Sequence, residues 1–255
     1  MKVKYFASAE ETALNILRDY IIPGTQESSG YHVALSGGTT PELLFALMAR
    51  PEYIHLINWD HLHLYWVDER MVDPENPQSN YGMAKRIMLD HVPLTPDQIH
   101  RIIGESEDAE DEANRYALEV LRSLSPQNSQ RRWLADQPNV NNSIQQAHFD
   151  LVLLGIGEDG HTASIFPEVI ELVNAKPLYV TSKHPVTGQQ RVGLSGSGIC
   201  SAVHIVFLAT GPAKAAVLKE IVNDTMQAQV YPAMQICNKR PDSILYTDSI
   251  SPSNY

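Results

Sequence analysis

The segment that decides the fold is Phe149-Asp150-Leu151-Val152-Leu153-Leu154-Gly155-Ile156-Gly157-Glu158-Asp159-Gly160-His161-Thr162. Its four consecutive apolar residues, Leu151 to Leu154, do not alternate with polar ones, which predicts a strand buried on both faces. The glycine-rich residues that follow place Asp159 and His161 directly behind the carboxyl end of this strand. Open α/β sheets bind their ligands at that edge. The plainer alternative is a strand-to-helix turn that needs glycine only for its backbone angles.

Similar apolar segments recur along the chain and alternate with helical patterns. The expected strands are residues 3–6, 32–35, 63–67, 149–154 and 204–209. Helices are expected from Ser8, which forms a capping box with Glu11, to about Tyr20, and over residues 108–124 and 212–222. This alternation predicts an α/β fold with a mostly parallel sheet and helices on both faces.

We expect residues 1–255 to form one domain. Between residues 125 and 147 the composition changes to Gln, Asn, Ser and Pro, and we expect a polar surface excursion there rather than a linker. Apolar runs of bilayer-spanning length are absent from the sequence, and the N-terminal residues lead into a helix signal rather than a cleavable segment. The sequence therefore favours a soluble, cytoplasmic protein without a membrane partner.

The composition argues against two classes of function. The net charge of −11, from 19 basic and 30 acidic residues, argues against nucleic-acid binding, which depends on Lys and Arg. Cys200 and Cys237 are far apart in the sequence, so we expect buried thiols rather than a disulfide framework or a zinc cluster. The histidines other than His161 have no ligand spacing with Asp, Glu or Cys, so we predict no metal dependence.

A second glycine-rich loop, Ser36-Gly37-Gly38-Thr39-Thr40-Pro41, follows the expected strand at 32–35. We expect Thr40 to cap a helix that begins at Pro41. Free N–H groups and hydroxyls at a helix N-terminus bind phosphate, whereas a capped turn without a ligand is the alternative. The loop matches neither a Walker sequence nor a dinucleotide fingerprint.

Cations elsewhere in the chain extend this anion site. Asp68-Glu69-Arg70 follows the strand at 63–67, and at least one of the three side chains should face the crevice. The Arg70 guanidinium suits a carboxylate, a phosphate or a developing oxyanion, although such triplets are also common in solvated loops. Lys214 lies in the first turn of an expected helix, where a cation is unfavourable unless an anion binds. The predicted phosphate-binding residues are Ser36, Gly37, Gly38, Thr39, Thr40, Arg191 and Lys214.

Taken in order, these motifs resemble those of the 6-phosphogluconolactonase family. The matching parts are the loop at 36–41, Asp68-Glu69-Arg70 with Ser79-Asn80, residues 155–167 (GIGEDGHTASIFP), Arg191, and Gly211 with Lys214. The resemblance extends from Val3 to Asp248. It implies a Rossmann-like fold shared with glucosamine-6-phosphate deaminase, ribose-5-phosphate isomerase and coenzyme A transferases. It also implies hydrolysis of 6-phospho-D-glucono-1,5-lactone to 6-phospho-D-gluconate in the oxidative pentose phosphate pathway.

The deaminases are the main alternative, because they resemble this sequence in the phosphate loop and the Asp-Gly-His core. A deaminase continues into Phe-Asn-Glu-Pro and carries Asp-Glu-Tyr, whereas this chain has Ala163-Ser164-Ile165-Phe166-Pro167 and Asp68-Glu69-Arg70. Both differences favour the lactonase. The lactonases have a threonine two residues after the arginine where this chain has Gly193, and residues 125–147 extend beyond the family pattern. A catalytically silent sugar-phosphate sensor is a third hypothesis, against which the intact Asp159 and His161 argue.

The resemblance implies that His161 acts as a general base for water attack on the lactone carbonyl. Asp159 or Asp68 would orient the imidazole, and the sequence does not decide between them. Arg70 would stabilise charge on the carbonyl oxygen or bind the product carboxylate. No cofactor is expected, the partner is a phosphorylated sugar lactone, and the sequence does not predict an oligomeric state.

Overall fold

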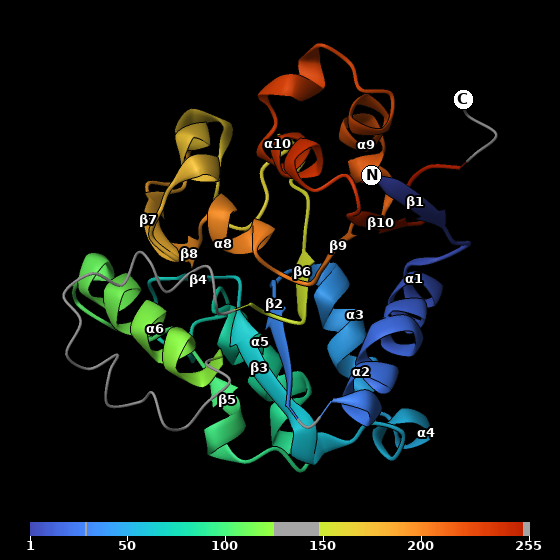
Figure 1. Ribbon diagram of the computed structural model, residues 1–255, viewed down its shortest axis with the longest axis vertical. Coiled ribbons are helices and arrows are strands. Elements are labelled where there is room, and N and C mark those ends of the chain that lie inside the picture. Colours follow the sequence, from blue (N-terminus) through green and yellow to red (C-terminus); the bar gives the residue numbers. More distant parts are fainter. Residues whose placement is uncertain (29, 125–147, 252–255) are drawn as a thin grey trace.

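The computed structural model describes residues 1–28, 30–124 and 148–251. Within these ranges a sheet of seven parallel strands has the order β1-β10-β9-β6-β2-β3-β5 (Figure 1). The strands are β1 Lys2–Tyr5, β10 Ile244–Thr247, β9 His204–Leu208, β6 Leu151–Leu154, β2 Tyr31–Leu35, β3 Leu62–Trp66 and β5 Ile99–His100. The predicted α/β fold with a mostly parallel sheet is confirmed. The predicted surface excursion at 125–147 lies outside the described residues.

Helices lie on both sides of this sheet. Figure 1 shows α1, α2 and α3 on one side of β2 and α6 on the other. The helices are α1 Ala9–Ile16, α2 Ile22–Glu27, α3 Thr39–Met48, α4 Pro51–Ile54, α5 Asn80–Ile87, α6 Ala109–Leu124, α8 Gly196–Cys200, α9 Ala215–Val222 and α10 Pro232–Lys239. A π-helical turn, η1 Leu17–Ile21, joins α1 to α2. The short 3₁₀ helices are η2 Trp59–His61, η3 Leu89–His91, η4 Pro96–Gln98, η7 Pro167–Asn174, η8 Pro212–Lys214 and η9 Gln227–Val230.

Local sequence explains the central elements. All four residues of β6 are buried, as their unbroken apolar run predicts. Ser8 caps α1 by accepting a hydrogen bond from the Glu11 amide at 3.2 Å, so the predicted capping residue is confirmed. The strands predicted at 3–6, 32–35, 63–67 and 204–209 agree with β1, β2, β3 and β9 to within one residue at each end.

Two parts of the architecture were not predicted. Strand β10 inserts between β1 and β9, although its four residues lack a distinctive pattern. A second sheet is antiparallel and has the order β4-β8-β7, with β4 Asp68–Arg70, β8 Gln190–Leu194 and β7 Tyr179–Lys183. Its first strand consists of three charged residues, so only pairing with a distant part of the chain makes it a strand.

The strand order determines where ligands can bind. The chain runs from β2 outward to β3 and β5, and the strand on the other side of β2 is β6, which leads outward to β9. The neighbouring strands β2 and β6 therefore form the point where the direction of winding reverses. Their carboxyl ends open a crevice there, and the loops that follow both strands border it.

The described residues include no helix with the length and apolar character needed to span a bilayer. Cys237 is buried and Cys200 is half-buried, so the expectation of buried thiols is correct for Cys237 and only partly for Cys200.

Candidate active site

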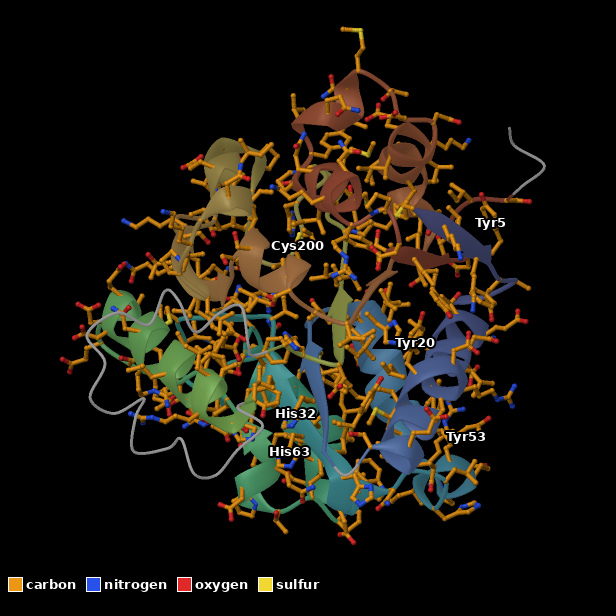
Figure 2. All side chains as sticks on the ribbon, viewed as in Figure 1. Tyr5, Tyr20, His32, Tyr53, His63 and Cys200 are labelled. Atoms are coloured by element: carbon orange, nitrogen blue, oxygen red, sulfur yellow. The ribbon has the colours of Figure 1, made fainter. Side chains whose placement is uncertain are left out.

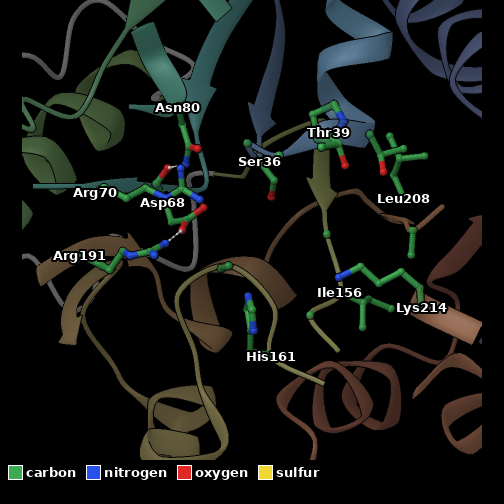
Figure 3. A pocket seen from close by; sticks show the side chains of 18 residues that line it. Ser36, Thr39, Asp68, Arg70, Asn80, Ile156, His161, Arg191, Leu208 and Lys214 are labelled. Atoms are coloured by element: carbon green, nitrogen blue, oxygen red, sulfur yellow. Dashed lines mark hydrogen bonds and ion pairs between the residues drawn. The ribbon is translucent and has the colours of Figure 1, made fainter. Parts of the chain in front are cut away.

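One pocket of about 200 Å³ lies at the carboxyl edge of the large sheet (Figure 3). It is lined by the segments that follow β2, β6 and β9, by residues of β4 and β8 in the small sheet, and by the first residue of α5. All the sequence-predicted site residues except Asp159 line this pocket: Ser36, Gly37, Gly38, Thr39, Thr40, Asp68, Arg70, His161, Arg191 and Lys214. The side chains named from the sequence therefore meet in space, although they lie up to 178 positions apart.

His161 faces the pocket from the loop after β6, and Figure 3 shows its ring between Asp68 and Lys214. Its Nδ1 atom lies 2.6 Å from Oδ1 of Asp159, which also accepts a hydrogen bond from the His161 amide at 3.1 Å. The ring contacts the buried Phe166, with centroids 4.9 Å apart. Among the described residues none forms a hydrogen bond with Nε2, which leaves this nitrogen available to a ligand.

Asp159 stays ionised beside the imidazole. Burial raises its pKa, but the hydrogen bonds and charge of His161 outweigh burial and lower the pKa to about 2. Gly157 makes this pairing sterically possible, because a Cβ atom there would lie 2.1 Å from His161 Nδ1 and 2.4 Å from Asp159 Oδ1. The close approach of the two functional side chains therefore requires glycine at position 157.

Asp68 makes different contacts from Asp159. Its Oδ2 atom accepts a hydrogen bond from the Ser164 hydroxyl at 2.6 Å and lies 3.7 Å from Nη1 of Arg191. Gly193 pairs with Asp68 across the small sheet, and a Cβ atom at Gly193 would lie 3.3 Å from the Cβ atoms of both Asp68 and Ser164. The unexpected glycine therefore borders the tight packing of this acidic group.

Arg70 and Arg191 are paired residues on β4 and β8, and Figure 3 shows both beside Asp68. Burial lowers the pKa of Arg191, Asp68 opposes this effect, and the Arg70 charge adds to it. Like charges on opposed strand positions repel each other. The buried Nε atoms of both arginines lack a hydrogen-bond partner in the described structure, so a bound anion would offset the repulsion and satisfy these donors.

The glycine-rich loop after β2 leads into α3 earlier than predicted. The cap predicted at Thr40 is wrong, because Gly38 is the N-cap residue and its φ of 107° favours glycine. The Thr40 hydroxyl instead lies 2.7 Å from that of Thr210, and the Ser36 hydroxyl donates to the Leu153 carbonyl at 2.9 Å. Gly38, Thr39 and Thr40 still line the pocket at the start of α3, where an anion is favoured.

Lys214 ends the 3₁₀ helix η8 and precedes α9, so the predicted continuous helix over 212–222 is wrong at its start. Gly211 begins this turn with a φ of 86°, and its amide donates to Asp248 at 2.8 Å. Figure 3 shows Lys214 on the other side of the pocket from Arg191, beside Ile156. The two cations predicted to share a phosphate thus approach the pocket from different walls.

Sequence reasoning assigned no site role to several pocket residues. Asn80 lines the pocket and is 2% exposed, yet its Oδ1 atom has no hydrogen-bond partner in the described residues. The signal for it in the sequence is the Ser79-Asn80 pair, which forms part of the resemblance. The apolar residues Ile156, Leu208 and Ala209 complete the wall near Lys214, and their sequence context resembles any buried strand end. No group of three His, Cys, Asp or Glu side chains suited to a metal ion occurs in the ranges that the structure describes.

Comparison with known proteins gives one consistent result. The family model described as glucosamine-6-phosphate isomerases/6-phosphogluconolactonase matches residues 6–245. Curated relatives named 6-phosphogluconolactonase, from Haemophilus influenzae and Aggregatibacter actinomycetemcomitans, are 36% and 35% identical over 243 residues, which cover 95% of this chain and of each relative. The crystal structure of devB protein has a TM-score of 0.84 at 31% identity and covers 97% of both chains. The chain therefore belongs to the glucosamine-6-phosphate isomerase/6-phosphogluconolactonase family.

Proposed function

We propose that this protein is a 6-phosphogluconolactonase, which hydrolyses 6-phospho-D-glucono-1,5-lactone to 6-phospho-D-gluconate in the oxidative pentose phosphate pathway. One observation carries the proposal: the His161 imidazole and the glycine-rich loop at 36–40 line the same pocket. Relatives named for this activity match nearly the whole chain and support the choice of substrate.

His161 is the general base in this proposal. A lactone carbonyl is an activated electrophile, so water with one positioned base can attack it. The imidazole takes a proton from water through Nε2 while the water oxygen forms a bond with C1, assistance worth about 10²- to 10⁴-fold in rate. The bond between C1 and the ring oxygen then breaks, and the imidazolium returns its proton to that oxygen. Histidine suits this exchange because it gains and loses a proton near neutral pH.

Asp159 is the residue that orients His161. Its 2.6 Å contact with Nδ1 keeps the proton of the neutral ring on that nitrogen and leaves Nε2 free to act as a base. Asp68 is bound to Ser164 and lies near Arg191, which supports a different role for it, namely to hold Arg191 in place.

Arg70 stabilises negative charge at C1. Its guanidinium lines the pocket with an unpartnered Nε, and its Nη1 atom donates to the Gln78 carbonyl at 2.5 Å, which fixes the group. Preorganised donors of this kind favour a transition state in which charge moves onto the carbonyl oxygen. The same donors would bind the carboxylate of the product.

The phosphate of the substrate binds to the loop at 36–40 together with Lys214 and Arg191. Amides at the start of α3 and the Lys214 ammonium supply positive charge, and Arg191 reaches the pocket from the small sheet. Because the phosphate is remote from C1, its binding energy serves to hold the lactone against His161.

A lactonase assay on purified protein tests the proposal. Acid release from freshly prepared lactone is measured with and without the protein, and the spontaneous rate is subtracted. We expect a rate proportional to protein concentration. The absence of acceleration would refute the proposal, and ammonia release from glucosamine 6-phosphate would instead establish a deaminase.

A further inference from the structure

Glu69 is a fully buried carboxylate that does not line the pocket. Its side chain is 1% exposed, and it lies between Asp68 and Arg70 on β4. Successive side chains of a strand point to opposite faces, so Glu69 points away from the face on which its two neighbours meet the ligand. Among the described residues no cation forms an ion pair with it.

Four hydrogen bonds compensate for the burial of this charge. Oε1 accepts from the amides of Arg70 and Asn80, both at 2.8 Å, and Oε2 accepts from the Tyr81 amide at 2.8 Å and from the Ser79 hydroxyl at 3.0 Å. Burial raises the pKa of Glu69, and these four donors offset only part of that rise. Three of the donors belong to the beginning of α5, where the helix dipole also favours a negative charge.

Two side chains accept the hydrogen bonds of the first three backbone N–H groups of α5. Ser79, its N-cap residue, accepts from the Gly82 amide at 2.9 Å while its hydroxyl donates to Glu69. The amides of Asn80 and Tyr81 bind Glu69 directly. A serine alone would suffice to cap a surface helix, so the buried carboxylate serves an additional purpose, which is to join β4 to α5.

The junction between β4 and α5 fixes two residues that line the pocket, Arg70 and Asn80. Arg70 is held at its backbone and at its side chain. Its amide donates to Glu69, and its Nη1 atom donates to the Gln78 carbonyl just before α5. The Asn80 side chain donates to the Asp68 carbonyl at 2.8 Å. Its Oδ1 atom lies so close to the glycine-rich loop that a Cβ atom at Gly37 would be 1.8 Å away.

We propose that Glu69 is a positioning residue, whose carboxylate sets the places of Arg70 and Asn80 in the pocket by joining strand β4 to helix α5. This inference rests on the proposed lactonase function. It separates Glu69 from His161 and Lys214, which are held by other loops.

The substitution Glu69→Gln tests the inference. An amide keeps the shape but replaces one acceptor oxygen with an NH₂ group that faces two donors. We expect kcat/KM to fall about 100-fold, the effect of displacing a substrate-positioning group by about 1 Å. The matched control is Glu112→Gln, because Glu112 is also buried, at 3% exposed, and binds the Ile103 amide and Arg115 away from the pocket. The control should leave kcat/KM within about threefold of wild type.

A double-mutant cycle distinguishes positioning from a general loss of folded protein. If Glu69 acts through Arg70, Glu69→Gln should lower kcat/KM less than about tenfold when Arg70 is already alanine. It should retain its full effect of about 100-fold in a Lys214→Ala protein. Equal effects in both backgrounds would overturn the inference, because a smaller folded fraction multiplies every rate equally.

Two further results keep the test decisive. If Glu69→Gln does not fold, Ser79→Ala takes its place in the same cycle, because it removes one donor to Glu69. Calorimetric titration with 6-phosphogluconate should show weaker binding to the folded variant than to Glu112→Gln. An inactive wild-type protein would refute the proposed function, whereas an active wild type with an equally active Glu69→Gln variant would refute only this inference.

Discussion

Replacing Gly157 by alanine adds a methyl group where the loop after β6 has no space for it. The added Cβ atom would lie 2.1 Å from Nδ1 and 2.3 Å from Cε1 of His161. An ordinary contact between such atoms needs about 3.5 Å, so the imidazole must move by more than 1 Å. A displacement of this size at a reacting group costs about 100-fold in rate. We therefore expect Gly157→Ala to lower kcat about 100-fold.

The same substitution should cost little stability. The atoms that meet the new methyl group belong to the side chains of His161 and Asp159, which are 32% and 46% exposed and can rotate toward solvent. The melting temperature should therefore stay close to that of the wild type. The control is Gly30→Ala, whose Cβ atom would meet only His32 Nε2, at 3.4 Å, far from the pocket.

The assay is lactone hydrolysis corrected for the spontaneous rate, combined with thermal unfolding of each variant. Low kcat with an unchanged melting temperature fits the expected displacement of the imidazole. A folded Gly157→Ala protein with the kcat of the Gly30→Ala control would refute the reasoning, because the position of His161 would then not matter to the reaction.

Lys214→Ala should raise KM by roughly 10- to 100-fold with little change in kcat, because it removes a charge-assisted contact to the remote phosphate; steady-state kinetics would contradict this if kcat alone fell. Asp159→Asn should lower kcat at every pH from 5 to 9, since the pKa of about 2 keeps the carboxylate ionised throughout; an unchanged rate profile would exclude Asp159 as the orienting group. Burial, with the charges of His63 and His100, lowers the pKa of His32 to about 4, below the 6.5 of an unfolded histidine. Protonation linked to His32 should therefore remove about 3 kcal/mol of stability as pH falls from 6.5 to 4, and denaturant titrations of His32→Phe should show a correspondingly smaller loss than the wild type.

The His32 prediction concerns a part of the molecule that the sequence did not reveal. His32 and His63 stack at 4.9 Å, and His63 and His100 at 5.7 Å, on the neighbouring strands β2, β3 and β5 (Figure 2 labels the first two). Each histidine lacks a partner nearby in the sequence. Only the strand register, which places His32 opposite His63, brings the rings together.

The site was more predictable than the surroundings of its residues. Glycine-rich loops after apolar strands identified His161 and the loop at 36–40, because parallel strands bring their carboxyl ends to one edge. The choice between Asp159 and Asp68 depends on side-chain directions, which spacing does not determine. The role of Glu69 depends on α5, which begins eleven residues later at Asn80, so the Asp68-Glu69-Arg70 triplet alone gave no indication of it.

The exact first residues of two helices were also not predictable from the sequence. Thr40 and Pro41 have the right chemistry for a cap and a first residue, yet α3 begins at Thr39 because Gly38 adopts a positive φ. Lys214 was expected inside a helix and instead ends a 3₁₀ turn before α9. Backbone conformations at glycine decide both boundaries, and sequence propensities do not specify them to within two residues.

The central claim is that the imidazole of His161 activates water in the pocket that also binds the sugar phosphate. The most direct measurement is the turnover of the lactone by purified His161→Ala protein, with the spontaneous rate subtracted and folding verified by thermal unfolding. The account predicts that kcat falls about 10²- to 10⁴-fold while KM changes little. A folded His161→Ala protein with near-normal turnover would contradict it.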